Sequence, residues 1–428
     1  MHFTSLSDWL TWQETLHPNV IDMGLERVAC VAQALRLGRP ATTVITVAGT
    51  NGKGSCVALL ESVLGAAGYR VGAYTSPHLL RYNERVRVGG CEVDDAELCA
   101  AFERIDAVRG DTSLTYFEFG TLAALEIFAN AQLDVAVLEV GLGGRLDAVN
   151  IVDADCALIT SIGIDHVEWL GSDREAIGRE KAGILRAGRP GVYGESDPPH
   201  SVLAQAESVD APLYCLARDY HYAHTDLTWQ WHSSATRYTD LPIPNLPGAF
   251  QLQNAAAVLM VLEQLAESLP VSEAALRQGL QAVRLPGRFQ VRPGAVEQIL
   301  DVAHNPHGAQ ALAEALRQRP CSGRTHLVLA MLADKDAAGV CAALRPVVDA
   351  WYCAGLAGPR GQSGEQLVVS AGLVTERDAL TIHADVASAC AQAAVAARAG
   401  DRIVVCGSFH TVAEALQYRE KLLLDRGK

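Results

Sequence analysis

The sequence of 428 residues is 49% hydrophobic and 20% charged, with a formal net charge of −14 at pH 7. That length accommodates two or three domains, and the composition is typical of a globular chain. The acidic charge argues against nucleic acid and membrane partners, and no apolar run approaches the roughly 20 residues that span a bilayer. The opening segment MHFTSLSDWLTWQ lacks a secretory pattern and the 11 cysteines lack paired spacing, so we expect a cytoplasmic protein with reduced thiols.

Short apolar segments alternate with amphipathic ones along the first part of the chain. We expect strands at 43–48, 71–75, 134–140 and 156–162, and helices at 54–68, 94–109 and 117–131. This alternation is typical of a largely parallel α/β sheet. Residues 214–243 alternate aromatic and polar side chains, which predicts antiparallel strands, and helices are expected at 250–268 and 272–283.

The segment Leu285-Pro286-Gly287-Arg288-Phe289 interrupts this pattern. After it the α/β alternation restarts, with strands expected near 297–302, 325–331, 350–354, 380–383 and 402–406. We therefore expect an α/β protein with a first domain at 1–284, a linker at 285–296 and a second domain at 297–428.

A glycine-rich loop, Gly49-Thr50-Asn51-Gly52-Lys53-Gly54-Ser55, joins the first expected strand to the first expected helix. Glycines let backbone N–H groups approach a polyphosphate, a lysine adds positive charge, and a serine hydroxyl can reach magnesium. The loop departs from the commonest phosphate-loop pattern, because Val47 replaces a glycine and Gly54 separates the lysine from the serine. The alternative is a tight turn with a solvated lysine, but the strand and helix on either side favour nucleotide binding.

Polar residues follow several other expected strands, where ligands bind in open parallel sheets. Glu139 ends one strand before a glycine run, and is suited to hold magnesium. Asp165 or His166 could face the same site, although magnesium prefers oxygen ligands to imidazole. Ser76 follows another strand, and the lysine at 181 would ordinarily be a surface cation.

In the second α/β part, Asp301, His304 and Asn305 follow a strand and could hold a ribose or a phosphate. Arg288 could reach a phosphate from a different domain than Lys53, which would couple domain closure to assembly of the site.

Taken together, the motifs resemble those of the folylpolyglutamate synthase/dihydrofolate synthase family of the Mur-ligase superfamily. The segments that carry the resemblance are GTNGKGS, TSPHLLRYNERV, YFEFGTLAAL, EVGLGGRLDAVN, SIGIDHVEWLG, GREKAGILR, LPGRFQ and DVAHNPHGA. They span nearly the whole chain. The resemblance implies an N-terminal Mur-ligase-type P-loop ATPase domain and a C-terminal Rossmann-like domain.

The resemblance also implies roles for individual residues. ATP would contact Asn51, Gly52, Lys53, Gly54, Ser55, Asn254, Arg288 and Asp301, and Mg²⁺ would be held by Ser76, Glu139 and His166. Lys53, Lys181 and His166 would be catalytic, with Lys181 carried as a carbamate (N6-carboxylysine). The substrate would contact Asp22, Met23, Gly24, Leu25, Thr115, Tyr116, Phe117, Glu118, Leu146, Asp147, Ala148, His304 and Ser408. K⁺ is a further candidate cofactor.

The implied reaction is an ATP-dependent ligation. A carboxylate of dihydropteroate or a reduced folate attacks the γ-phosphate of ATP, and the amine of L-glutamate then captures the acyl phosphate as an amide. These small molecules would be the only partners of a monomeric enzyme. Three alternatives stay open: a folylpolyglutamate synthase with one activity, a Mur-type peptidoglycan ligase, and a nucleotide-operated switch. Only about 40 residues precede the loop, which is few for the UDP-sugar domain of a peptidoglycan ligase.

Overall fold

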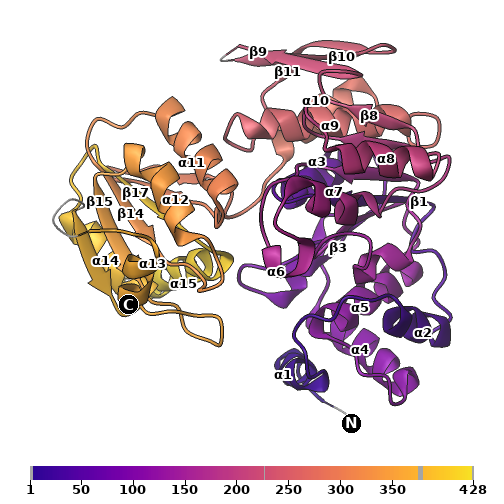
Figure 1. Ribbon diagram of the computed structural model, residues 1–428, viewed down its shortest axis with the longest axis horizontal. Helices are drawn as coiled ribbons and strands as arrows, with labels where there is room; N and C mark the ends of the chain where they lie inside the picture. The colour runs from indigo at the N-terminus through magenta and orange to yellow at the C-terminus, as the bar shows by residue number, and fades with distance from the viewer. Residues whose placement is uncertain (1–2, 226, 375–378, 427–428) are drawn as a thin grey trace. The chain divides into compact units, whose positions relative to one another are not determined.

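The computed structural model describes residues 3–225, 227–374 and 379–426, which divide into two compact units. The first unit comprises Met1–Asn245 and Gln251–Arg284, and the second comprises Leu246–Phe250 and Leu285–Lys428. Both contain a mainly parallel sheet with helices packed on it, so the α/β fold class expected from the sequence is confirmed (Figure 1).

The sheet of the first unit has eight strands in the order β4-β3-β2-β5-β1-β6-β7-β8. Their bounds are β1 Thr43–Ala48, β2 Val71–Tyr74, β3 Val86–Val88, β4 Cys91–Glu92, β5 Val135–Glu139, β6 Cys156–Ile159, β7 Gly191–Tyr193 and β8 Leu213–Cys215. The six strands from β2 to β8 in this order run parallel, whereas β3 and β4 add an antiparallel hairpin at one edge. The carboxyl ends of β2, β5, β1 and β6 therefore meet at one edge of the sheet.

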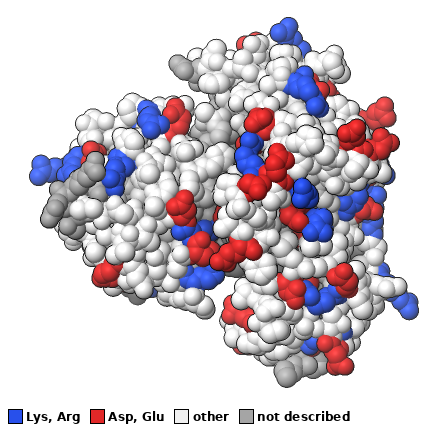
Figure 2. Space-filling model, viewed as in Figure 1, with Lys and Arg blue, Asp and Glu red and all other residues white. Residues whose placement is uncertain are grey.

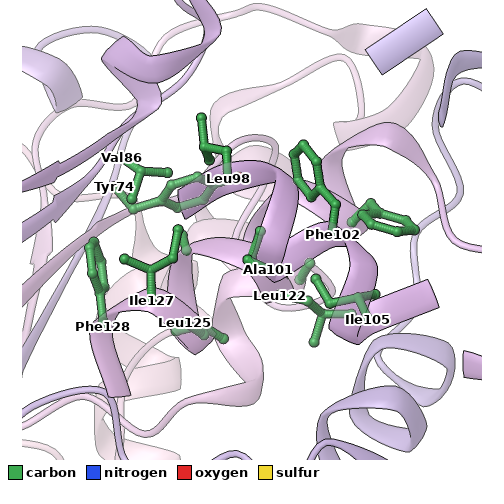
Figure 3. Packing of buried hydrophobic residues seen from close by; sticks show 14 of the residues in the cluster. Tyr74, Val86, Leu98, Ala101, Phe102, Ile105, Leu122, Leu125, Ile127 and Phe128 are labelled. Atoms are coloured by element: carbon green, nitrogen blue, oxygen red, sulfur yellow. The ribbon is translucent and has the colours of Figure 1, made fainter. Parts of the chain in front are cut away.

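Helices cover both faces of this sheet. One face carries α1 Leu6–Leu16, α2 Glu26–Ala34, α4 Asp95–Arg109, α5 Tyr116–Asn130, α7 Arg174–Ala182 and α8 His200–Ser208. In the core on this face, Tyr74 and Val86 of the sheet meet Leu98, Phe102 and Phe128 from α4 and α5 (Figure 3). Full burial of side chains of this size stabilises the fold by roughly 1.5–3 kcal/mol each.

The opposite face carries α3, Lys53–Ala66, which packs against α10, Glu273–Ala282. The two helices approach closely, because a Cβ atom added at Gly279 would lie 2.5 Å from the Cα atom of Val63. The Ser62 hydroxyl also donates a hydrogen bond of 2.8 Å to the carbonyl of Gly279. These contacts fix α10 to the helix that follows the glycine-rich loop.

A separate antiparallel sheet is formed by β9 Tyr220–His224, β10 Thr228–Ser233 and β11 Arg237–Pro242, as the alternating sequence predicts. The indole N–H of Trp231 donates to the carbonyl of Ala256 at 3.0 Å, which joins this sheet to α9, Phe250–Gln264.

The second unit has a six-stranded sheet in the order β12-β13-β17-β14-β15-β16. Its strands are β12 Gln290–Arg292, β13 Glu297–Leu300, β14 Thr325–Leu329, β15 Ala350–Ala354, β16 Leu380–His383 and β17 Arg402–Cys406. The sheet is parallel except for β12, which lies in the segment 285–296 that was expected to be a linker. The helices are α11 Pro306–Gln318, α12 Ala337–Leu344, α13 Gly364–Ser370, α14 Val386–Ala396 and α15 Phe409–Arg426. Within the described ranges, no helix combines the length and the apolar character that a membrane crossing requires.

Candidate active site

The glycine-rich loop lies between β1 and α3, where the sequence predicts it. Gly49 and Gly52 adopt φ angles of 154° and 88°, which side-chain-bearing residues rarely adopt. Neighbouring side chains also exclude a Cβ atom: at Gly49 it would lie 1.8 Å from Thr160 Oγ1, and at Gly52 it would lie 2.6 Å from Asn254 Oδ1. Asn254 on α9, one of the residues expected to contact the nucleotide, therefore lies directly against the loop.

Two hydroxyl residues after β6 hold the loop in place. Thr160 Oγ1 donates to the carbonyl of Asn51 at 2.6 Å, and Ser161 Oγ accepts from the N–H of Asn51 at 3.0 Å. Thr50 Oγ1 bonds to both the N–H and the carbonyl of Gly163 at 3.0 Å. Sequence reasoning did not single out Thr160 and Ser161, although two consecutive hydroxyl residues at the end of a parallel strand were a usable signal.

Lys53 opens α3 and lies over the loop. Its Nζ donates to the carbonyl of Gly49 at 2.9 Å and to that of Thr50 at 3.3 Å. The first N–H groups of α3 and this ammonium group make the loop an electropositive cradle, which suits an anion such as a phosphate. Ser55, two residues further, is buried in the first turn of the helix.

A second lysine, Lys181, is buried in the last turn of α7. This burial contradicts the reading of this lysine as an ordinary surface cation. Burial and, to a lesser extent, the positive charge of Lys53 together lower the pKa of Lys181 to about 7, although Asp165 and Asp147 act in the opposite direction. The two lysines and two aspartates thus interact electrostatically at one site, and a substantial part of the Lys181 amine is neutral near pH 7.

Asp147 is the buried partner of this cluster. Its carboxylate accepts hydrogen bonds from the N–H groups of Leu142 at 2.8 Å and Val149 at 3.0 Å, and it begins a short 3₁₀ helix, η2, Ala148–Ile151. Burial raises the pKa of Asp147 to about 6, against the opposing effect of these hydrogen bonds and of Lys53.

The three expected metal ligands follow parallel strands at the same sheet edge. Glu139 is the buried last residue of β5 and lies in register with Val47 of β1. Ser76 follows β2, and His166 follows β6 in a left-handed conformation with φ of 51°. The described ranges contain no cluster of three or more His, Cys, Asp or Glu residues suited to a metal. A carboxylate, a hydroxyl and an imidazole nevertheless form a donor set that fits a magnesium or manganese ion completed by phosphate oxygens and water.

The glycine run after β5 brings two expected substrate residues to this edge. A Cβ atom at Gly141 would lie 2.5 Å from the ring of Phe117, and one at Gly143 would lie 3.3 Å from the terminal methyl of Met23. The glycines therefore allow close packing of an aromatic ring and a thioether against the backbone. Leu146 and Ala148, also expected to contact substrate, flank Asp147 at the end of the run.

Arg27 joins the expected substrate segments 22–25 and 115–118. Its guanidinium donates to the carbonyl of Asp22 at 2.9 Å and to Glu118 Oε1 at 3.0 Å, and lies 3.1 Å from Asp22 Oδ2. Glu118 and Thr115 form a capping box at the start of α5, each accepting from the other's backbone N–H. Gly24, Leu25 and Tyr116 are half-buried beside these residues in sequence. Sequence reasoning missed Arg27, which a search for basic residues next to segment 22–25 would have found.

In the second unit, Asp301, Arg288 and His304 lie close together. Asp301 is buried and accepts from the N–H groups of Phe289 at 2.7 Å and Ala303 at 2.8 Å. Burial raises the pKa of Asp301, and the charges of Arg288 and His304 oppose that rise. The Arg288 guanidinium lies 4.8 Å from the ring centre of Phe409, a residue that sequence reasoning did not identify.

Ser408, the other expected glutamate-side residue, is buried immediately before α15. Its hydroxyl lies 2.6 Å from Thr411 Oγ1 and accepts from the N–H of Thr411 at 3.0 Å, so it caps the first turn of the helix.

A phosphate loop on a parallel sheet, followed by a second α/β unit, is the arrangement of Mur ligases. The family model "Mur ligase middle domain" matches residues 47–262, and "Mur ligase, glutamate ligase domain" matches residues 287–409. The dihydrofolate synthase/folylpolyglutamate synthase of Escherichia coli is 49% identical over 96% of this chain and 95% of its own, and that of Haemophilus influenzae is 44% identical over 96% of both chains. The chain therefore belongs to the dihydrofolate synthase/folylpolyglutamate synthase family of Mur ligases, as its motifs indicate.

Solved structures agree with this membership. A structure of E. coli FolC in complex with DHPP and ADP is 48% identical, with a TM-score of 0.93 over 98% of both chains. A bifunctional folylpolyglutamate synthase/dihydrofolate synthase from Yersinia pestis, complexed with AMPPNP and a Mn ion, is 51% identical with a TM-score of 0.91 over 97% of this chain and 98% of that chain.

Proposed function

We propose that the chain is an ATP-dependent ligase that joins L-glutamate to dihydropteroate, forming dihydrofolate, and to reduced folates, forming polyglutamates. The observation that carries this proposal is the cluster of Lys53, Lys181, Asp147 and Asp165 at the glycine-rich loop. It combines an electropositive phosphate cradle with a lysine whose amine can be neutral. Family membership over nearly the whole chain supports both activities.

The proposed nucleotide contacts come from each unit. In the first unit, residues 51–55 would bind the phosphates, with Asn254 against the loop at Gly52. In the second unit, Arg288 and Asp301 would contact the nucleotide, with Phe409 holding the guanidinium in place. Ser76, Glu139 and His166 would hold Mg²⁺, which when bound neutralises charge on the transferring phosphoryl group.

The chain's own residues then have distinct tasks. A substrate carboxylate attacks the γ-phosphorus, ADP leaves, and an acyl phosphate forms, while Lys53 offsets the charge that develops on the transferred group. The glutamate amine attacks the acyl carbon, and phosphate departs to leave an amide. Asp147, with residues 22–25, 115–118, 146 and 148, would bind the pterin end, and His304 and Ser408 would face glutamate.

Lys181 is the proposed site of carbamylation. A neutral amine is the form that reacts with CO₂, and burial beside Lys53 supplies that form near pH 7. The carbamate would replace a cation by an anion near the loop, where a second divalent ion could use it. His166, the third proposed catalytic residue, would act as a ligand to the first ion.

A ligation assay with purified protein, ATP and glutamate tests the proposal. Turnover of dihydropteroate and of a reduced folate is expected, and a failure with dihydropteroate alone would leave a folylpolyglutamate synthase with one activity. Stimulation of ATP hydrolysis by a UDP-muramoyl substrate instead would indicate a peptidoglycan ligase, and ATP hydrolysis independent of glutamate would indicate a switch.

Repeating the assay with Na⁺ in place of K⁺ tests whether the enzyme needs a particular monovalent cation, and sedimentation tests whether it is a monomer.

A further inference from the structure

One buried side chain connects the turn after Asp147 to the end of the helix that carries Lys181. Asn150, in η2, is 8% exposed. Its Nδ2 atom donates to the carbonyl of Arg145 at 3.0 Å and to that of Gly183 at 3.1 Å. The two N–H hydrogens of this amide therefore bond to two different segments, which are more than 30 residues apart in the sequence.

A second residue fixes the orientation of this amide. Arg186 donates from one guanidinium nitrogen to Asn150 Oδ1 at 2.8 Å and to the Asn150 carbonyl at 3.0 Å. Its other terminal nitrogen donates to the Gly183 carbonyl at 3.1 Å. Because Oδ1 has a charged donor, the amide cannot be reversed without losing three hydrogen bonds.

The two segments that Asn150 joins are in close backbone contact. The N–H of Arg145 donates to the carbonyl of Glu180 at 2.8 Å. A Cβ atom at Gly144 would lie 3.0 Å from the carbonyl of Lys181, and one at Gly183 would lie 2.4 Å from the Cβ of Arg145. The position of the Lys181 backbone relative to the glycine run is therefore set by this packing and by the Asn150 amide.

We propose that Asn150 is a positioning residue for Lys181, holding its amine beside Asp147 and the phosphate loop in the place where it takes up CO₂. This inference rests on the proposed role of Lys181. In that step the lone pair of the neutral amine attacks the carbon of CO₂ and forms a C–N bond. One C=O electron pair moves to oxygen, the nitrogen loses a proton to solvent, and a carbamate anion results. Asn150 itself touches neither CO₂ nor substrate.

The test compares Asn150→Ala and Asn150→Asp with a matched control. Asn150→Asp keeps an acceptor for Arg186 but removes both donors. The control is Asn130→Ala, since Asn130 at the end of α5 also donates twice, to the carbonyl and to Oε1 of Glu126, both at 2.9 Å. Carbamate at Lys181 is trapped as an ester with an alkylating oxonium reagent and measured by peptide mass across a series of dissolved CO₂ concentrations at fixed pH.

We expect the CO₂ concentration for half-occupancy to rise about tenfold in both Asn150 variants, a typical effect of losing a supporting contact around a reactive centre. High CO₂ should restore both occupancy and ligation, and Asn130→Ala should match the wild type. If the Asn150 variants do not fold, Arg186→Ala, which frees the amide to turn, should shift the occupancy curve in the same direction.

The inference would be overturned if Asn150→Ala and Asn150→Asp gave the same occupancy curves as the wild type. It would also be overturned if the variants stayed inactive after high CO₂ had brought Lys181 to full carbamate occupancy. The proposed role of Lys181 fails separately: a wild-type enzyme that ligates at full rate with no trapped carbamate at any CO₂ concentration overturns that role and the inference with it.

Discussion

Lys53 and Lys181 are two of only five lysines in the sequence, the others being Lys335, Lys421 and Lys428. Arginine, by contrast, provides most of the positive charge, since lysine and arginine together number 35. On the face shown in Figure 2, basic and acidic side chains are interspersed, and many of the arginines form ion pairs such as Arg174–Asp197 and Arg145–Glu180. Arginine always stays charged, whereas a buried lysine can lose its proton. Two of the five lysines thus belong to the candidate site, where a titratable amine or a compact charge has a chemical use.

Replacing Lys53 by alanine should abolish ligation with little effect on the fold. The ammonium group neutralises charge on the transferring phosphoryl group, and loss of one such electrostatic contact costs about 10²–10³-fold in rate. The measurement is product formation from ATP, glutamate and dihydropteroate, with circular dichroism to check folding. Lys421→Ala, at an exposed position, is the control. A Lys53→Ala enzyme that keeps most of its activity would remove this lysine from the mechanism.

The state of Lys181 should depend on pH in a specific direction. Its folded-state pKa is lowered to about 7, so the neutral amine, and with it carbamate at constant dissolved CO₂, should increase as pH rises through about 7. An ordinary lysine would show this rise near pH 10. Lys53→Ala removes a like charge and should move the midpoint upward, whereas Asp147→Asn removes an opposing charge and should move it downward. Ester trapping across a pH series measures the midpoint, and equal midpoints in all three proteins would contradict the electrostatic coupling.

Gln13 on α1 should be replaceable with a gain in stability. Its side chain is 1% exposed, and neither amide atom has a hydrogen-bond partner among the residues that the structure describes. A buried unsatisfied polar group costs about 1–3 kcal/mol, so Gln13→Leu, of similar volume, should raise the free energy of unfolding by a comparable amount. Denaturant unfolding measures the change. Gln33→Leu, at an exposed position of α2, should change stability by less than about 0.5 kcal/mol, and an equal effect of the two substitutions would contradict the argument.

At the residue scale, the sequence predicted those parts of the site that lie in one continuous motif. The loop from Gly49 to Ser55 could be read directly, because strand, turn and helix follow each other along the chain. The burial of Lys181 and the contacts of Thr160, Arg27 and Phe409 could not be predicted in that way. Each depends on which segment packs against which, and that is settled by tertiary structure.

At the scale of elements, the glycine run 141–144 controls the distance between β5 and α7. Gly144→Ala should reduce ligation by at least about tenfold, because a Cβ atom there would lie 2.8 Å from the carbonyl of Glu180 and 3.0 Å from that of Lys181. Both are backbone atoms, so the helix end itself must shift. Gly65→Ala in α3 is the control, since its Cβ would meet no atom of the described part of the chain within 4 Å. Full activity of Gly144→Ala would show that the position of the α7 end is not critical.

The longer strands and helices occur where hydrophobic periodicity places them, usually within two residues. The strand expected at 156–162 is an exception, since β6 ends at Ile159. Thr160 and Ser161 hold the phosphate loop through their side-chain hydroxyls, a role that the apolar pattern does not reveal. Strands of two to three residues such as β4, β7 and β12 were also missed, because two or three residues are too few to show an alternation of apolar and polar side chains.

At the scale of the whole molecule, nucleotide binding should depend on both units. Arg288→Ala should weaken ATP binding, measured by calorimetry or by KM for ATP, by about tenfold or more, because a charge-assisted hydrogen bond contributes about 1.5–3 kcal/mol. The control in the same unit is Arg317→Ala, whose exposed pair with Glu314 contributes little. An unchanged affinity in Arg288→Ala would exclude the second unit from the nucleotide contacts proposed here.

The close packing of α10 on α3 has a consequence for the place where the chain leaves the first unit. The helix that begins at Lys53 and the helix that ends at Ala282 are fixed to each other by Gly279 and Ser62. The first unit ends two residues later, at Arg284. One of the covalent connections between the units therefore begins two residues after a helix that is fixed to the helix following the phosphate loop, so any shift of α3 must be absorbed by α10 before it reaches Arg284.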